Sequence, residues 1–161
     1  MSEKARLRKI EDDLNVGGAG IIILGVWGVV RVLIEVFLGT RDSLDLESEN
    51  PGTRVIVTLI VIATVTVIAV IVMKIHLYVG LNAMKAAKGR EHKKGYYTVA
   101  VIMLIISVLG LASYWEDIRK IEHIDTTIAS ILVDLTSIYV YVVIIKSTLR
   151  INKLKENIQK D

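Results

Sequence analysis

The sequence predicts an all-α integral membrane protein built as a bundle of four transmembrane helices. Of its 161 residues, 53% are apolar, and they are gathered in long runs instead of recurring at the period of an amphipathic helix or strand. The four runs cover residues 18–38, 55–73, 97–115 and 128–145. At a rise of ~1.5 Å per residue, a helix of about 20 residues crosses a hydrocarbon core of roughly 30 Å. We therefore expect four spans in a single domain.

The basic residues predict the orientation of these spans. Fifteen of the 20 Lys and Arg residues lie in segments 1–17, 74–96 and 146–161, whereas the outer segments 39–54 and 116–127 hold four and are rich in acids. Positively charged loops stay on the cytoplasmic side of a membrane. Both termini are therefore expected in the cytoplasm, and the bilayer with its anionic head groups is the first expected partner.

Short amphipathic helices are expected in each of the three basic segments. Residues 5–14 place Leu7, Ile10 and Leu14 on one side, and a flexible bend is expected at Gly17–Gly20, before the first span. The second span is expected to continue as a cytoplasmic helix to about residue 87, with an apolar stripe of Leu77, Leu81 and Met84 and with Gly89 as its C-cap. Residues 149–158 form the third basic, amphipathic segment.

A weak internal repeat links the two halves of the chain. Residues 81–85, Leu-Asn-Ala-Met-Lys, follow the second span, and residues 151–155, Ile-Asn-Lys-Leu-Lys, follow the fourth. A duplicated helical hairpin, repeated in parallel, would produce this similarity. A chance likeness between two basic helix ends explains it equally well.

Three ionisable side chains lie inside the apolar runs: Arg31, Glu35 and Asp134. Each would cost about 2.5–3.5 kcal/mol if it faced lipid near the bilayer centre. Arg31 and Asp134 are expected at similar depths, roughly 10 Å below the outer surface, and Glu35 lies one turn above Arg31. We expect an Arg31–Asp134 ion pair with Glu35 as a second partner. It serves either as a structural pair that fixes the register of the bundle or as a transport or binding site.

Small and polar residues recur along one side of each span and predict the packed faces. In membranes, small residues let helices approach closely, so such stripes mark an ordinary bundle core; a narrow polar path that opens outward is the alternative. The residues in this packing stripe are Gly28, Thr66, Ser107, Gly110, Ser130, Ser137 and Tyr141.

The sequence offers no pattern for catalysis, for a metal or for a cofactor. It has no cysteine, and His76, His92 and His123 are far apart, with no partner at metal-ligand spacing. Nucleotide-binding loops, nucleophile elbows and zinc-protease motifs are missing from the sequence. The basic segments are explained by topology and anionic lipid, so we expect no nucleic-acid partner.

Four helices with a glutamate in the first, here Glu35, resemble the small multidrug exporters. The sequence departs from that family in three respects. Glu35 lies near the outer end of its helix, Arg31 is one turn away, and the loops and tails are long and charged. The chain is therefore not assigned to that family.

Three functions are compatible with these features. The first is a non-enzymatic interaction, regulatory or accessory subunit of a bacterial-type inner membrane, which contacts another membrane protein or a second copy of itself. The second is a small oligomeric transporter or channel that uses Arg31, Glu35 and Asp134. The third is an enzyme acting on lipid, for which no nucleophile or base is identifiable. The first function is preferred, because catalytic groups are missing and because no proline breaks the spans, as discontinuous helices do in many transporters.

Overall fold

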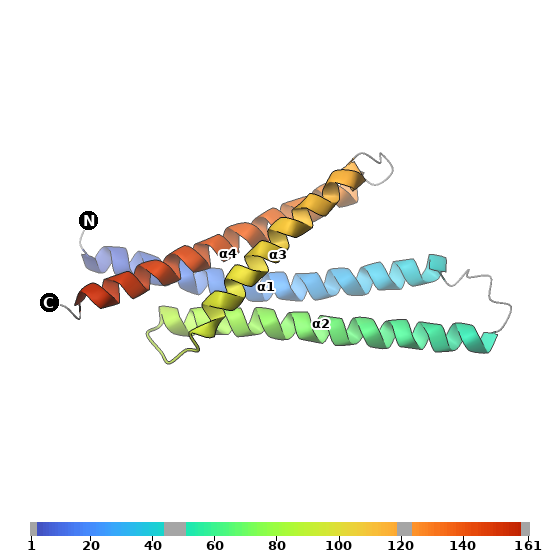
Figure 1. Cartoon of the computed structure of the whole chain (residues 1–161), viewed down its shortest axis with the longest axis horizontal. Helices are drawn as coiled ribbons and strands as arrows, with labels where there is room; N and C mark the ends of the chain where they lie inside the picture. The colour runs from blue at the N-terminus through green and yellow to red at the C-terminus, as the bar shows by residue number, and fades with distance from the viewer. Residues whose placement is uncertain (1–2, 44–50, 119–123, 159–161) are drawn as a thin grey trace.

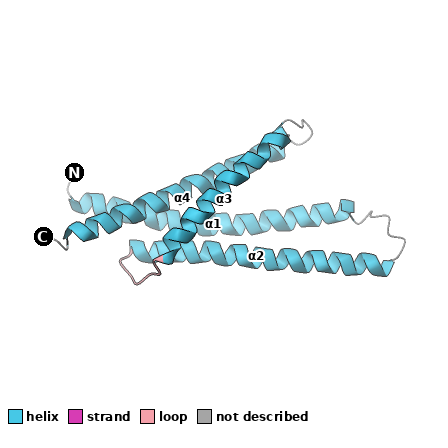
Figure 2. Ribbon diagram, viewed as in Figure 1, coloured by secondary structure: helices cyan, strands magenta, loops and turns pink. Residues whose placement is uncertain are grey.

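The computed structural model describes residues 3–43, 51–118 and 124–158 of the chain. The described part is helical except for the loop at residues 88–94 (Figure 2). Its helices are α1 (Glu3–Ser43), α2 (Pro51–Ala87), α3 (Gly95–Ile118) and α4 (Ile124–Ile158). Within these residues, four helices are long and apolar enough to cross a membrane, as the sequence predicts. In the acidic outer segments 39–54 and 116–127, residues 44–50 and 119–123 lie outside the described residues.

The helix α1 is continuous, so the predicted bend at Gly17–Gly20 is wrong. The basic segments at both ends of the chain are likewise the ends of α1 and α4 and not separate helices. Ile10 and Leu14 are buried among protein side chains, because the start of α1 packs against the rest of the molecule. The glycines are accommodated within the helix because neighbouring helices pack against them.

The end of α2 agrees with the sequence. The helix runs to Ala87, and Gly89 adopts φ = 65°, a left-handed conformation that glycine reaches without the steric cost of a Cβ. The Gly89 N–H donates to the Ala86 carbonyl at 3.1 Å, and the Arg90 N–H donates to the Lys85 carbonyl at 2.9 Å. This pair of bonds is the Schellman motif, which confirms Gly89 as the cap.

The helices are arranged as two hairpins that meet at one end (Figure 1). The helices α1 and α2 run side by side, α3 and α4 form the second hairpin, and α1 and α4 connect the two. We call the junction the basic end; here α1 starts, α2 ends, α3 starts, α4 ends, and both termini lie (Figure 1). Every member of the hydrophobic core lies in this half of the molecule: Ile10, Leu14, Ile21, Val79, Ala83, Ala86, Ala87, Tyr96, Ala100, Tyr141, Ile144 and Ile151.

A close helix contact joins α1 and α2 through two glycines. A Cβ at Gly80 would lie 2.5 Å from the Gly18 carbonyl oxygen, and a Cβ at Gly18 would lie 2.7 Å from the Gly80 carbonyl oxygen. About two turns farther along α1, a Cβ at Gly25 would lie 2.5 Å from the Cβ of His76. Only glycine permits backbones to approach this closely, so these residues set the distance between α1 and α2.

The predicted stripe of Leu77, Leu81 and Met84 follows the packed face of α2 in part: Leu77 and Met84 are half-buried, and Met84 lies next to Gly18 of α1. Leu81 is 46% exposed, whereas Ala83 is fully buried, as is Val79. Small side chains are common among the buried residues of this segment, which include Ala83, Ala86 and Ala87.

Away from the basic end the two hairpins diverge (Figure 1). A Cβ at Gly17 would lie 3.0 Å from Ile144, and one at Gly20 would lie 3.4 Å from Val140, but one at Gly28 would meet nothing within 4 Å. We use the name outer halves for the parts of the four helices that lie away from the basic end, namely residues 24–36, 55–70, 102–112 and 128–138. Large apolar side chains there are exposed, such as Leu109 at 67% and Leu132 at 60%.

Candidate functional site

Polar side chains gather in the packed half of the molecule, and one hydrogen bond joins α2 to α4. His76 Nδ1 lies 2.8 Å from the Val72 carbonyl oxygen, and His76 Nε2 lies 3.3 Å from the Tyr141 hydroxyl. A carbonyl only accepts, so Nδ1 carries the proton. In the neutral ring Nε2 is then the acceptor, and Tyr141 donates to it. Both ring nitrogens of His76 are thus occupied within the protein.

A second hydrogen bond joins α3 to α4. The Thr148 hydroxyl donates to the Ile144 carbonyl at 2.8 Å, so its oxygen accepts from the Tyr96 hydroxyl, also at 2.8 Å. Both side chains are buried. A buried hydroxyl without a partner is costly, so this bond favours one register of α3 on α4.

Asn82 holds the loop between α2 and α3. Its side-chain amide donates to the Tyr78 carbonyl at 2.7 Å, and its carbonyl oxygen accepts from the Lys93 N–H at 3.0 Å. His92, in the same loop, packs edge-on against Tyr96, with ring centroids 5.7 Å apart. The loop at 88–94 is thereby tied to both helices that it connects.

The intramembrane charges lie on the two helices that diverge. Arg31 on α1 and Asp134 on α4 are both half-buried, and neither is without a partner; the side chain of Glu35 lies outside the described residues. The contacts Gly17–Ile144 and Gly20–Val140 set an antiparallel register. By that register Arg31 is level with Ser130, one turn from Asp134. The predicted pairing of Arg31, Glu35 and Asp134 stays a prediction.

The residues of the predicted packing stripe are placed in several environments. Tyr141 is buried, whereas a Cβ at Gly110, as at Gly28, would meet nothing within 4 Å, since the hairpins have diverged there. The Thr66 hydroxyl donates to the Ile62 carbonyl of its own helix and is exposed, and Ser137 donates to Val133 in the same way. Ser107 and Ser130 are half-buried. Tyr141 forms a hydrogen bond to another helix, through His76 of α2.

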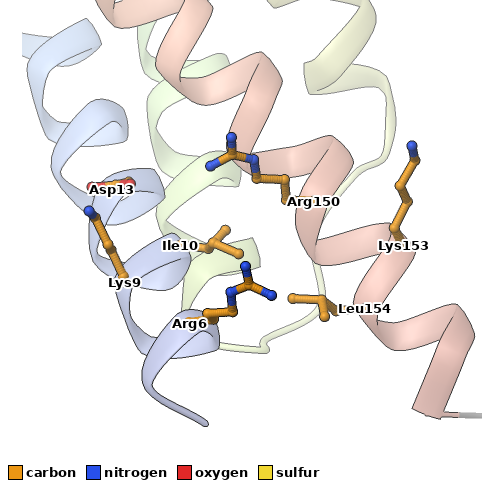
Figure 3. A pocket seen from close by; sticks show the side chains of 7 residues that line it. All are labelled: Arg6, Lys9, Ile10, Asp13, Arg150, Lys153 and Leu154. Carbon is orange, nitrogen blue, oxygen red and sulfur yellow. The ribbon is translucent and has the colours of Figure 1, made fainter. Parts of the chain in front are cut away.

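A basic pocket lies between the start of α1 and the end of α4. Its volume is about 490 Å³, and it is lined by Arg6, Lys9, Ile10, Asp13, Arg150, Lys153 and Leu154. The guanidinium groups of Arg6 and Arg150 are directed into the gap between the helices, with Ile10 between them (Figure 3). Lys153 points away from the gap (Figure 3). Four cations and one carboxylate make this a candidate anion site.

A second pocket, of about 470 Å³, lies between the loop at 88–94, the start of α3 and the end of α4. It is lined by His92, Lys94, Tyr96, Tyr97, Thr148, Leu149 and Asn152. Among the described residues, no three His, Asp or Glu side chains are grouped so that they could hold a metal ion.

Sequence reasoning missed the basic pocket and the close approach of Gly18 to Gly80. The cations of the two tails were each assigned to topology, and nothing in their spacing shows that the first turn of α1 meets the last turns of α4. For Gly80, the isolated glycine in an otherwise bulky helix was the available signal.

Comparison of the chain with protein-family models, with curated proteins and with solved structures gives no match.

Proposed function

We propose that the chain is a small, non-enzymatic integral protein of the cell membrane that acts as an interaction or regulatory subunit. The observation that carries this proposal is the divergence of the two hairpins. Their outer halves leave large apolar side chains uncovered, while the core formed by the described residues lies at the basic end. A second membrane protein, or a second copy of this chain, would cover these faces.

Lipid alone is a poor cover for parts of the outer halves. Gly28 and Gly110 leave open space of the kind that lets another helix approach closely. Small residues at these two positions favour protein contacts there.

The proposal places both termini in the cytoplasm. Both termini and the basic loop at 88–94 lie at the same end of the molecule (Figure 1), where positively charged residues are concentrated. Because the chain has no cysteine, single substitutions report orientation cleanly. In right-side-out vesicles, a membrane-impermeant maleimide should label Thr53→Cys but not Lys94→Cys. Labelling of Lys94→Cys alone would reverse the orientation.

Association is tested by counting chains in native membrane at the natural expression level. We expect the protein to be recovered in nanodiscs with a second copy or with a defined partner, identified by photobleaching steps and by cross-linking mass spectrometry. Gly110→Leu should lower the associated fraction by filling the space at Gly110. Ala112→Leu is the matched control, because Ala112 lies on the opposite side of α3. A chain that is always single and without a partner contradicts the proposal.

A second candidate function, a small oligomeric transporter or channel, is favoured by one observation. Opposite charges lie on the facing halves of two diverging helices, Arg31 on α1 and Asp134 on α4, with Glu35 on α1 as the third expected member. Its test is proton flux in proteoliposomes, followed with a pH-sensitive dye. Flux above that of empty vesicles, lost in Asp134→Asn, supports it; no flux, or flux that Asp134→Asn leaves unchanged, contradicts it.

A further inference from the structure

The two ends of the chain bring two arginines together. Arg6 is in the first turns of α1 and Arg150 is in the last turns of α4, and both line the basic pocket. Their guanidinium groups are directed into the same gap from opposite sides of Ile10 (Figure 3). Two planar, permanently charged groups thus share one space although they are 144 positions apart in the sequence.

The charge of this pocket is not balanced by its surroundings. Among the described side chains, no ion pair or hydrogen bond engages Arg6, Lys9, Arg150 or Lys153, and Asp13 is the one acid in the lining. Arg6 also lies near the N-terminus of α1, where the helix dipole already adds positive potential. Like charges held together in this way are stabilised by a bound anion.

The chemistry of the lining selects the anion. The guanidinium fork matches the geometry of phosphate oxygens and binds them through paired, charge-assisted hydrogen bonds. Ile10 is only 9% exposed and forms part of the core, and Leu154 packs against that core, so one wall of the pocket is apolar. Such a wall strengthens a charged contact relative to one made in bulk solvent.

We propose that Arg6 and Arg150 clamp a phosphate group in this pocket, with Lys9 and Lys153 at its rim. The volume of about 490 Å³ accommodates a phosphate together with the group that carries it. This site involves the basic end alone and does not depend on what covers the outer halves.

The phosphate has two possible sources. Arg150 follows Ile145, the end of the predicted fourth span, by five residues, which places it ~7.5 Å beyond the apolar layer, at the level of lipid head groups. An anionic lipid reaches that level from the bilayer, whereas a soluble phosphate compound reaches it from water.

The experiment is isothermal titration calorimetry, in which each probe is titrated into the full chain in neutral detergent. Dihexanoyl phosphatidic acid is the lipid probe, and inorganic phosphate and pyrophosphate are the soluble probes. We expect one site per chain, and an affinity that falls about tenfold or more in Arg6→Gln/Arg150→Gln, because two charge-assisted contacts are lost. Binding of the lipid probe alone identifies a head-group site; equal binding of pyrophosphate identifies a soluble ligand.

The matched control is Arg8→Gln/Lys146→Gln, which removes the same charge from exposed positions on α1 and α4 outside the pocket. Its affinity should stay within about twofold of the parent, since diffuse surface charge contributes little. Arg6→Lys/Arg150→Lys keeps the charge and the fold but loses the fork, and should bind more weakly than the parent. The proposal is overturned if Arg6→Gln/Arg150→Gln and the control Arg8→Gln/Lys146→Gln lose affinity equally. It is also overturned if the glutamine and the lysine variants of Arg6 and Arg150 both bind as tightly as the parent.

Discussion

The basic end and the outer halves of this molecule are made from the same four helices but pack differently. At the basic end, Gly18 and Gly80 bring two backbones together, and the pair Tyr96–Thr148 bonds across helices. In the outer halves, bulky side chains such as Ile60 are 59% exposed, and the hairpins separate.

The difference follows from the solvent that a membrane provides. Lipid tails are as apolar as leucine, so burying a valine or isoleucine against another helix gains little there. Helices associate in lipid where small residues permit close packing or where polar groups find partners across the interface. The basic end has both features, whereas the outer half of α2 is mostly Val, Ile and Thr. Apolar character alone therefore places these helices in a membrane without joining them.

The largest effect that tests this comparison is an all-or-none cross-link. Gly20→Cys/Val140→Cys should form a disulfide under mild oxidation, because a Cβ at Gly20 lies 3.4 Å from a Val140 methyl carbon. Gly28→Cys/Val133→Cys continues the same register into the outer halves and should not cross-link. The chain is cut between α1 and α4 and run on a gel without reductant. A disulfide keeps the two fragments together, so they migrate as one band. Equal cross-linking of both pairs would show that the hairpins close along their whole length.

A smaller effect is expected from adding one methyl group to a glycine. Gly80→Ala forces the Gly18 carbonyl to move and should destabilise the fold by about 1–3 kcal/mol. Gly28→Ala meets open space and should be neutral or stabilising by up to about 1 kcal/mol, the difference in helix propensity. Unfolding by sodium dodecyl sulfate in mixed micelles gives both values. Equal destabilisation by the two substitutions would remove the contrast between the regions.

The smallest effect concerns one hydrogen bond at the basic end. Tyr96→Phe and Thr148→Val should each destabilise the protein, and a double-mutant cycle should give a coupling of about 0.5–1.5 kcal/mol. The neighbouring change Tyr97→Phe serves as the control and should not couple to Thr148→Val. Additive effects of Tyr96→Phe and Thr148→Val would mean that the bond does not stabilise the packed end.

The helices themselves were predictable because length and apolar content suffice to identify them. The end of α2 at Gly89 was predictable too, since glycine there has a specific conformational role. The buried faces were not predictable in the same way. A span that is apolar on all sides has no periodicity that distinguishes its packed side. In the stripe of Leu77, Leu81 and Met84, which continues such a span, Leu81 is exposed while Leu77 and Met84 are half-buried.

The candidate sites show the same difference between features that the sequence predicts and features that it does not. Tyr141 was identified from sequence as a polar residue of a packing stripe, and it is buried and bonded to His76. The basic pocket was not identified, because it depends on the first turn of α1 meeting the last turns of α4. Such a contact between the two ends of the chain has no local signal in sequence.

The contact between Gly17 and Ile144 also has a mechanical consequence, because it divides α1 into unequal parts. About 14 residues, or ~21 Å, lie on the side of Glu3, and 26 residues, or ~39 Å, lie on the side of Ser43. If straight helices rotate about this fulcrum, a displacement at the short end becomes one roughly twice as large, and opposite in direction, at the long end. Arg6 and Arg150 lie on the short side, so drawing them together would act as a lever that spreads the outer ends of α1 and α4.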